Sequence, residues 1–265
     1  MKIVVLVKPV PDTYGGRLLD LETGLADRAA SETVLDEITE RALETVLRHA
    51  ESSEGVEVVA MTMAPEGAAS TLRKALAMGA HSAVHIADER LAGADLVRTA
   101  EVLAAALRRT GFDLVVTGNG STDGGGSVLP AMLGELLDVP AATGLTALEI
   151  TADAARGPRE AQGGTQTVAA ALPAVVSITE ALPDPRFPAL KGIMGAKKKP
   201  LEQLSLDDLA GELEALAAPL DETEEARSIL VAAAQRPPRE AGEIITDDGT
   251  AGERIAAFLA DRRLA

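Results

Sequence analysis

Short apolar runs alternate with helical patterns from Met1 to about Ile178, and this alternation restricts the possible folds more than any other feature. The apolar runs that predict strands are Lys2–Val7, Val56–Met63, Ala83–Ile86 and Leu114–Val116. Apolar residues at helical spacing predict helices over Leu35–His49, from about Leu72 to Met78 with Gly79 as the end, over Asp95–Arg109 and over Ala131–Leu137. This order predicts an α/β fold, with a mostly parallel, doubly wound sheet and helices on both faces.

The chain leaves this pattern after about Gly144. Three apolar stretches predict an antiparallel extension with a turn at Gly163 and Gly164, and they are Leu145–Ile150, Thr167–Ala171 and Ala174–Ile178. From Pro183 the sequence is largely irregular, and Ala251–Arg262 predicts a terminal helix. We therefore expect a nucleotide-binding α/β domain over residues 1–182 and a long C-terminal arm over residues 183–265. Because this arm is too apolar to be merely disordered, we expect it to wrap a partner subunit.

A glycine-rich segment, residues 117–132, follows the strand predicted at Leu114–Val116. Its glycines lack a Cβ, so their backbone N–H groups can approach a ligand closely, and they are Gly118, Gly120, Gly124, Gly125 and Gly126. Ser121, Thr122 and Ser127 add hydroxyl donors, and the start of the next helix adds a partial positive charge. These features are typical of a loop that binds phosphate, and a flexible turn is the alternative. The Walker lysine and the Gly-x-Gly-x-x-Gly fingerprint are both absent.

Three loops should meet at one edge of the predicted sheet. Lys8–Pro11, Met63–Pro65 and Thr117–Ser127 each follow the carboxyl end of an expected strand. Ligands of such sheets bind beyond the carboxyl ends of the strands. The sequence therefore predicts a nucleotide site at this edge.

Composition excludes several classes of function. The formal net charge of −16 argues against nucleic acid or an anionic membrane as the main partner. The chain has no cysteine, which excludes disulfides and thiolate chemistry and fits a reducing cytoplasm. Lys8 and Pro9 end the first apolar run too early for a signal peptide or a membrane span, so we expect no membrane insertion. Aromatic residues make up only 2%, which leaves little to stack on a base or flavin ring.

The sequence contains no convincing catalytic or metal-binding set. His49, His81 and His85 are its only histidines, and their spacing does not place them together. Ser121 and Ser127 have no histidine evidently placed to activate them. We therefore expect no catalytic residue and no metal site, and the chain is not predicted to be an enzyme in its own right.

The segment Pro185–Pro200 carries two unusual features. Lys197, Lys198 and Lys199 form a basic run in an acidic protein, which is either a solvated run of charge or a means of steering acidic partners. Leu190 is an apolar residue in a polar segment, and it is either packed against the body of the protein or presented to a partner as an anchor.

Several stretches together resemble the small (beta) subunit family of electron-transfer flavoproteins. They are Lys2–Thr13, Ala75–Ala80, Asp113–Gly118, Gly157–Ser177 and Pro185–Pro200. The resemblance implies the beta subunit of a heterodimer with an alpha subunit. Such a subunit accepts electrons from acyl-CoA or other flavin dehydrogenases and passes them towards the respiratory chain. The FAD is held mainly by the alpha subunit, and the beta subunit binds a structural AMP.

The resemblance also implies sites for individual residues. The AMP contacts would be Leu6, Thr33, Val34, Leu35, Asp36, Met63, Gly118, Asn119, Gly120, Ser121, Thr122, Asp123, Gly124, Gly125, Gly126, Ser127, Val128 and Leu129. Asp12, Thr13 and Tyr14, together with Leu35, would lie near the flavin. The residues that would dock on partner dehydrogenases are Leu190, Ile193, Met194, Lys197, Lys198 and Lys199.

Three alternatives stay open. In a bifurcating relative the beta subunit holds a second FAD in place of AMP, although Asp123–Pro130 looks more like the non-bifurcating type. A stand-alone adenine-nucleotide-binding regulatory domain would be a stable monomer with a dispensable tail. A nucleotide-dependent hydrolase or ligase would need a catalytic base and metal-binding carboxylates, which the sequence does not offer.

Overall fold

The structure is a computed structural model that describes residues 1–16, 18–28, 30–218, 228, 230–239, 242 and 244–264. The chain divides into two units, Met1–Val231 and Ala232–Ala265, and each is described by itself. Residues 219–227 of the expected arm lie outside the described residues.

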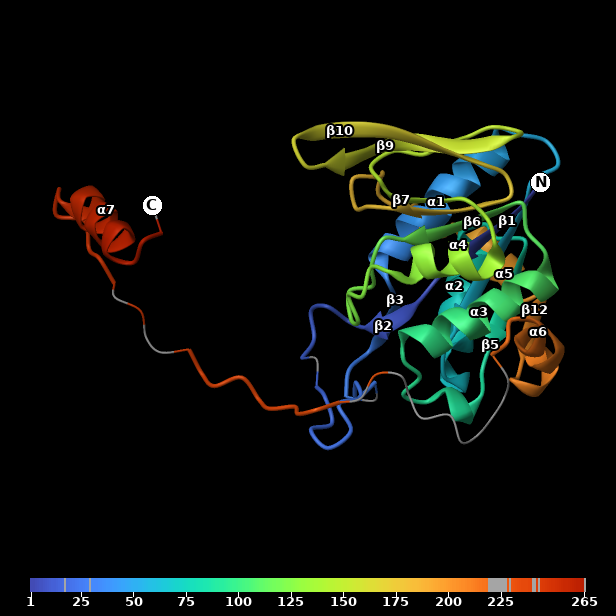
Figure 1. The fold of residues 1–265 in the computed structure, drawn as a ribbon, viewed down its shortest axis with the longest axis horizontal. Coiled ribbons are helices and arrows are strands. Elements are labelled where there is room, and N and C mark those ends of the chain that lie inside the picture. Colours follow the sequence, from blue (N-terminus) through green and yellow to red (C-terminus); the bar gives the residue numbers. More distant parts are fainter. Residues whose placement is uncertain are drawn as a thin grey trace. The chain divides into compact units, whose positions relative to one another are not determined.

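A ten-stranded sheet forms the frame of the first unit, with strand order β10-β9-β7-β11-β6-β1-β4-β5-β12 and β8 paired to β9 (Figure 1). The strands are β1 (Lys2–Leu6), β4 (Glu57–Met63), β5 (Ser82–Ile86), β6 (Leu114–Gly118), β7 (Ala141–Leu145), β8 (Glu149–Ile150), β9 (Ala154–Ala161), β10 (Gly164–Ala171), β11 (Ala174–Ile178) and β12 (Leu201–Leu204). All neighbours from β7 to β12 along this order are parallel. The predicted α/β fold with a mostly parallel sheet is confirmed.

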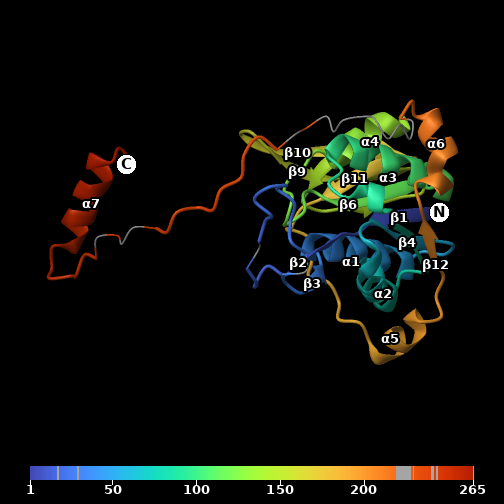
Figure 2. The same ribbon diagram turned by 90° about the horizontal axis from the view of Figure 1, so that it is seen from below.

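Helices cover both faces of this sheet. They are α1 (Glu37–Glu51) and α2 (Ala69–Met78) on one face, and α3 (Leu96–Thr110) and α4 (Leu129–Leu137) on the other (Figure 2). Successive strand residues point to opposite faces, so Ile3 and Val5 pack towards α1 and α2 while Val4 packs towards α3 and α4. This is why the central strands read as continuous apolar runs.

A second, two-stranded sheet stands beside the first. It consists of β2 (Pro9–Pro11) and β3 (Thr33–Leu35), which pair antiparallel and close the long loop between them. This loop leaves the side chain of Tyr14 96% exposed.

The prediction of an antiparallel extension is confirmed for one hairpin and wrong for β11. Strands β9 and β10 pair antiparallel around a turn at Gly163, whose φ of 86° suits glycine. However, Ala174–Ile178 lies inside the parallel sheet, between β6 and β7. All five of its residues are buried, which is the pattern of a strand with helices on both faces. Leu145–Ile150 is also not one strand, because β7 ends at Leu145 and β8 begins at Glu149.

The first part of the expected arm is more regular than the sequence suggested. It forms α5 (Leu190–Ala196), β12 and α6 (Ala210–Ala215), and β12 extends the sheet beside β5. Leu204, Leu209 and Leu213 are buried in the core that covers α3. These three leucines therefore pack on their own chain.

The second unit contains α7 (Ala251–Asp261), where the sequence predicts a terminal helix. None of its residues is buried, and its apolar side chains include Ile255 and Phe258. Within the described part of the chain, no helix is long and apolar enough to cross a membrane.

Candidate functional site

A cavity of about 460 Å³ lies at the carboxyl ends of β1, β4 and β6. Strands β4 and β5 follow β1 along the chain and lie on one side of it in the sheet. The later strands β6, β7 and β11 lie on its other side, so β1 and β6 flank the point where the strand order reverses. Doubly wound sheets bind their ligands at such a point. Lys8, Met63 and residues 117–121 all line the cavity, which confirms that the three predicted loops meet there.

Two glycines of the glycine-rich loop lie closely against neighbouring side chains. A Cβ on Gly118 would lie 2.7 Å from Ile38 Cγ2, and a Cβ on Gly120 would overlap Ser127 Oγ. Ser127 itself has a φ of 55°, a left-handed conformation that costs a non-glycine residue about 1–3 kcal/mol. A strained residue and two closely packed glycines beside a cavity are typical of a ligand-binding loop.

Three helices begin at the cavity. Ile38 and Thr39 of α1, Leu96 of α3, and Leu129 and Pro130 of α4 all line it. No side chain caps the N-terminus of α1 or of α4. Helix α3 is capped, because the Asp95 carboxylate, which also lines the cavity, accepts the Arg98 N–H at 2.9 Å. Uncapped helix N-termini carry partial positive charge and free N–H groups, so the part of the cavity at the starts of α1 and α4 favours an anion.

Lys8, Arg28 and Asp123 form a small cluster of charges at the glycine-rich loop. Lys8 Nζ donates to Asp123 Oδ1 at 2.7 Å and to Ser121 Oγ at 3.2 Å, and Arg28 Nη2 donates to Asp123 Oδ2 at 3.3 Å. Burial would raise the pKa of Asp123. This effect is outweighed by the hydrogen bond and positive charge of Lys8 and by hydrogen bonds from Ser121 and the Gly124 N–H. Together they lower the pKa of Asp123 to about 2. Asp123 is therefore ionised at neutral pH.

The eighteen residues that the resemblance assigns to AMP divide into two groups. Those that line the cavity are Leu6, Met63, Gly118, Asn119, Gly120, Ser121, Gly124, Gly126, Ser127 and Leu129. Those that do not line it are Thr33, Val34, Leu35, Asp36, Thr122, Asp123, Gly125 and Val128. The second group lies beside the first in the chain and in space, since Thr122 N donates to Asp36 Oδ2 at 2.9 Å.

A smaller hollow of about 250 Å³ collects the residues that the resemblance places near the flavin. Asp12, Thr13 and Tyr14 line it together with Leu35 and Asp36. Burial raises the pKa of Asp36 and also that of Glu40, which forms an ion pair with Lys74 in the same hollow. The two expected sites are thus neighbours, joined through the start of α1.

Sequence reasoning missed several cavity residues. They are Ile38, Thr39, Thr62, Ala94, Asp95, Leu96, Thr99 and Ser228, among others. Asp95 and Leu96 follow β5, so applying the carboxyl-end rule to that strand would have found them. Thr62 could not be found in this way. Its hydroxyl is buried without a hydrogen-bond partner in the described part of the chain, which only the packing reveals.

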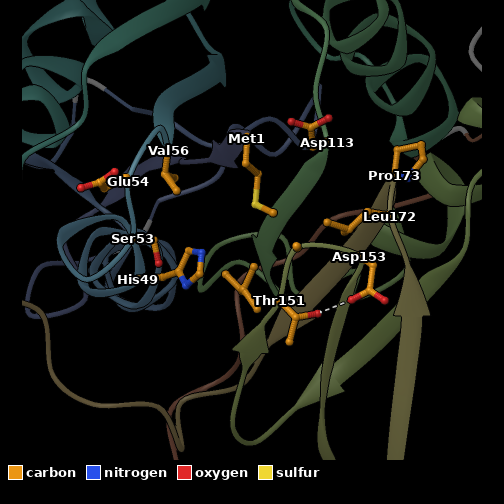
Figure 3. Close-up of a pocket in the computed structure, with 12 residues that line it drawn as sticks. Met1, His49, Ser53, Glu54, Val56, Asp113, Thr151, Asp153, Leu172 and Pro173 are labelled. Atoms are coloured by element: carbon orange, nitrogen blue, oxygen red, sulfur yellow. Dashed lines mark hydrogen bonds between the residues drawn. The ribbon is translucent and has the colours of Figure 1, made fainter.

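A larger hollow, of about 860 Å³, lies at the opposite edge of the sheet. His49, Ser53 and Glu54 stand on one side of it, and Asp153, Leu172 and Pro173 stand on the other (Figure 3). Asp113 and Glu54 add further acidic groups, and burial lowers the pKa of His49. An acidic hollow at the amino ends of the strands is a poor site for a phosphate, so we assign the nucleotide to the smaller cavity.

The segment expected to dock on dehydrogenases presents apolar side chains to solvent. The exposed fractions are 74% for Leu190, 50% for Ile193 and 64% for Met194. Helix α5 lies directly on α2, because a Cβ on Gly192 would overlap the carbonyl oxygen of Ala77.

Both ends of this segment are anchored on the body of the first unit. At its start, Arg186 forms ion pairs with Glu44 and Glu51 of α1. At its end, Lys199 Nζ donates to the carbonyl oxygens of Leu76 at 2.8 Å and Ala80 at 2.6 Å. Burial lowers the pKa of Lys199, while Lys197 and Lys198 are exposed. Lys199 therefore fixes the segment, and only its two neighbours are available to a partner.

Comparison with known proteins agrees with this geometry. Residues 23–209 match the model of the electron transfer flavoprotein domain. The electron transfer flavoprotein subunit beta of Mycobacterium tuberculosis is 41% identical, over 99% of this chain and 98% of that protein. The subunit beta of Bacillus subtilis is 37% identical over 79% of this chain and 80% of that protein. The caffeyl-CoA reductase-Etf complex subunit CarD of Acetobacterium woodii is 30% identical over 99% of this chain and 97% of that protein.

The chain belongs to the electron transfer flavoprotein beta subunit family. The resemblance found in the sequence is thus confirmed. The names of these relatives indicate an electron carrier rather than a catalytic enzyme, and a beta subunit implies an alpha subunit as its partner.

Proposed function

We propose that this chain is the beta subunit of a heterodimeric electron transfer flavoprotein and binds one AMP in the cavity beside β1 and β6. The observation that carries this proposal is the glycine-rich loop. A Cβ on Gly118 or Gly120 would press against Ile38 or Ser127, and the uncapped N-termini of α1 and α4 lie at the same cavity. Backbone N–H groups with partial positive charge are suited to the phosphate. The aliphatic residues Leu6, Met63 and Leu129 are suited to the base and ribose.

AMP fits this cavity better than FAD. A volume of about 460 Å³ lies within the range of about 300–1,000 Å³ typical of ligand sites. The cavity has no aromatic residue among the described residues that line it, so an isoalloxazine ring would have no side chain to stack on. The name of the CarD relative points to a complex with caffeyl-CoA reductase, and a bifurcating subunit with its own FAD is therefore the second candidate.

The FAD that carries electrons would be held mainly by the alpha subunit. In this proposal Asp12, Thr13, Tyr14 and Leu35 form a wall near its ring, around the hollow of about 250 Å³. The flavin supplies the redox chemistry, and this chain limits access to it from one side. The second unit, with its unburied helix α7, would lie on the alpha subunit.

Electrons would come from acyl-CoA or other flavin dehydrogenases that dock on α5, and would pass towards the respiratory chain. The heterodimer would be cytoplasmic. Leu190 and Met194 are exposed apolar residues on a short helix fixed at both ends. Such side chains can fill a pocket on a partner at little entropic cost. Lys197 and Lys198 would add steering towards acidic surfaces.

The test of this docking role uses the purified heterodimer and a partner dehydrogenase. Leu190→Ala should slow reduction of the flavin by the dehydrogenase by roughly thirtyfold at limiting concentration, since truncating an anchor costs about 2 kcal/mol. Reduction by a dye should not change. Leu21→Ala is the matched control, because Leu21 is an exposed leucine outside the segment. If Leu190→Ala lowers the melting temperature, or leaves the dehydrogenase rate unchanged, the docking role is wrong.

A further inference from the structure

We propose that Lys8 is the cation that binds the phosphate of the nucleotide, and that Asp123 and Ser121 position its ammonium group. This inference rests on the proposed AMP site and goes beyond it, because neither the glycine-rich loop nor the family resemblance assigns a charged ligand to the phosphate. The cation comes from the end of a different strand.

The backbone of Lys8 is fixed where β1 meets α1. Its carbonyl oxygen accepts the N–H of Asp36 at 2.9 Å, and its own N–H donates to Thr39 Oγ1 at 3.5 Å. From there the side chain extends to the glycine-rich loop, so that Nζ lies 3.7 Å from the position of a Cβ on Gly124. Lys8 thus bridges the end of β1 and the loop that follows β6.

The contacts of Lys8 leave its ammonium able to bind a further oxygen. Nζ has three donors, and two of them are used by Asp123 and Ser121. The side chain is 38% exposed and lines the cavity. One donor is therefore left for a ligand.

Lys8 supplies the positive side-chain charge of the cavity lining. Lys8 is the only lysine or arginine among the described residues that line the cavity. The carboxylate of Asp123 contacts Lys8 and Arg28 and also accepts the Gly124 N–H at 2.6 Å. Lys8 and Arg28 thus share the Asp123 carboxylate. Two further carboxylates are held by backbone N–H groups, since Asp36 accepts the Thr122 N–H and Asp95, which lines the cavity, accepts the Arg98 N–H. Asp123 does not line the cavity, so its charge holds Lys8 without facing the ligand.

This arrangement would replace the lysine of a Walker loop. In that motif the lysine belongs to the glycine-rich loop itself and contacts the phosphates. Here the loop has no lysine, and Lys8 reaches the corresponding end of the cavity from β1. The consequence is selectivity for a phosphorylated nucleoside over the free nucleoside.

The test is calorimetric titration of the nucleotide-depleted heterodimer with AMP and, separately, with adenosine. Lys8→Gln should weaken AMP binding by roughly tenfold to a hundredfold, the range expected for a hydrogen bond to a charged group, and leave adenosine binding within about twofold. Lys8→Arg keeps the charge and should retain most of the AMP affinity. Lys2→Gln is the matched control, because Lys2 lies at the other end of β1 and contacts Thr110 and Glu57.

Two results would overturn the inference while leaving the AMP site intact. One is that Lys8→Gln binds AMP as tightly as the wild type. The other is that it loses AMP and adenosine equally, which would make Lys8 a structural residue. A wild-type heterodimer that binds neither compound would instead overturn the proposed AMP site, and this inference with it.

Discussion

The carboxyl edge of the sheet and the segment around α5 recognise their ligands in opposite ways. The edge is a recess formed by backbone N–H groups, helix N-termini and one lysine. The segment is a projection whose contact surface is made of apolar side chains, among them Leu190 and Met194. Both depend on glycine. Gly118 and Gly120 keep side chains out of the recess, whereas Gly192 lets α5 lie against α2 so that its apolar side chains point outward.

Because the two regions bind by different means, a variant should be able to lose nucleotide binding without losing docking, and the reverse. A bulky residue in the recess excludes a small molecule without moving α5. A change under α5 moves the apolar side chains without touching the recess, which lies at the ends of β1, β4 and β6. Gly120→Asp and Gly192→Ala should therefore each change one kind of binding and spare the other.

The largest effect is expected for Gly120→Asp. Its Cβ would overlap Ser127 Oγ, and its carboxylate would face the phosphate, so nucleotide affinity should fall by roughly a hundredfold or more. Gly67→Asp is the control, because a Cβ on Gly67 meets nothing within 4 Å. Nucleotide content after purification is the measurement, and dehydrogenase docking should be unchanged. Full nucleotide content in Gly120→Asp would show that the ligand binds elsewhere.

The next largest effect is expected for Gly192→Ala. The added methyl group overlaps a backbone oxygen of α2, so α5 must shift, at a cost of about 1–3 kcal/mol in stability. We expect the rate of flavin reduction by the dehydrogenase to fall although Leu190 and Met194 are intact. Gly195→Ala lies in the same helix with open space around it and should retain the wild-type rate. Equal rates for both variants would contradict the idea of a fixed projection.

Asp123→Asn should lower stability by a smaller amount, on the order of 1 kcal/mol at neutral pH, since Lys8 and Arg28 are both partly exposed. The pKa of Asp123 is lowered from 3.8 to about 2 in the folded protein. Its stabilising contribution is therefore complete above about pH 4 and is lost as the pH falls towards 2. Melting temperatures of the two heterodimers should converge over this interval. A difference that does not depend on pH would contradict the ion-pair assignment.

The smallest effect concerns Lys197 and Lys198. Replacing both with alanine should slow association with the dehydrogenase by about threefold at low salt, and the difference should vanish at high ionic strength. Lys199→Ala should behave differently and lower the melting temperature, because Lys199 binds the carbonyl oxygens of Leu76 and Ala80. Stopped-flow rates measured at several salt concentrations separate the two roles.

Much of the fold could be predicted from the sequence because its elements carry local signals. The apolar runs of β1 and β4 and the glycine at the end of α2 are of this kind. The position of β11 was not predictable locally, because an apolar strand of five residues can pair with many neighbours. The same holds for β12, whose place beside β5 depends on residues more than a hundred positions away.

The site shows the same limit. The loops at Lys8, Met63 and Gly118 were found because the carboxyl ends of parallel strands share one edge. The pairing of Lys8 with Asp123 was not found, since it joins side chains separated by 115 positions. The roles of Lys199 and Gly192 were also hidden, because each depends on the close contact between α5 and α2.

The central claim is that the recess at the sheet edge holds AMP. The most direct test is to denature the purified heterodimer and identify the released small molecules by mass. The account predicts one AMP per copy of this chain and one FAD per heterodimer. Two FAD molecules without AMP, or no nucleotide beyond a single FAD, would contradict it.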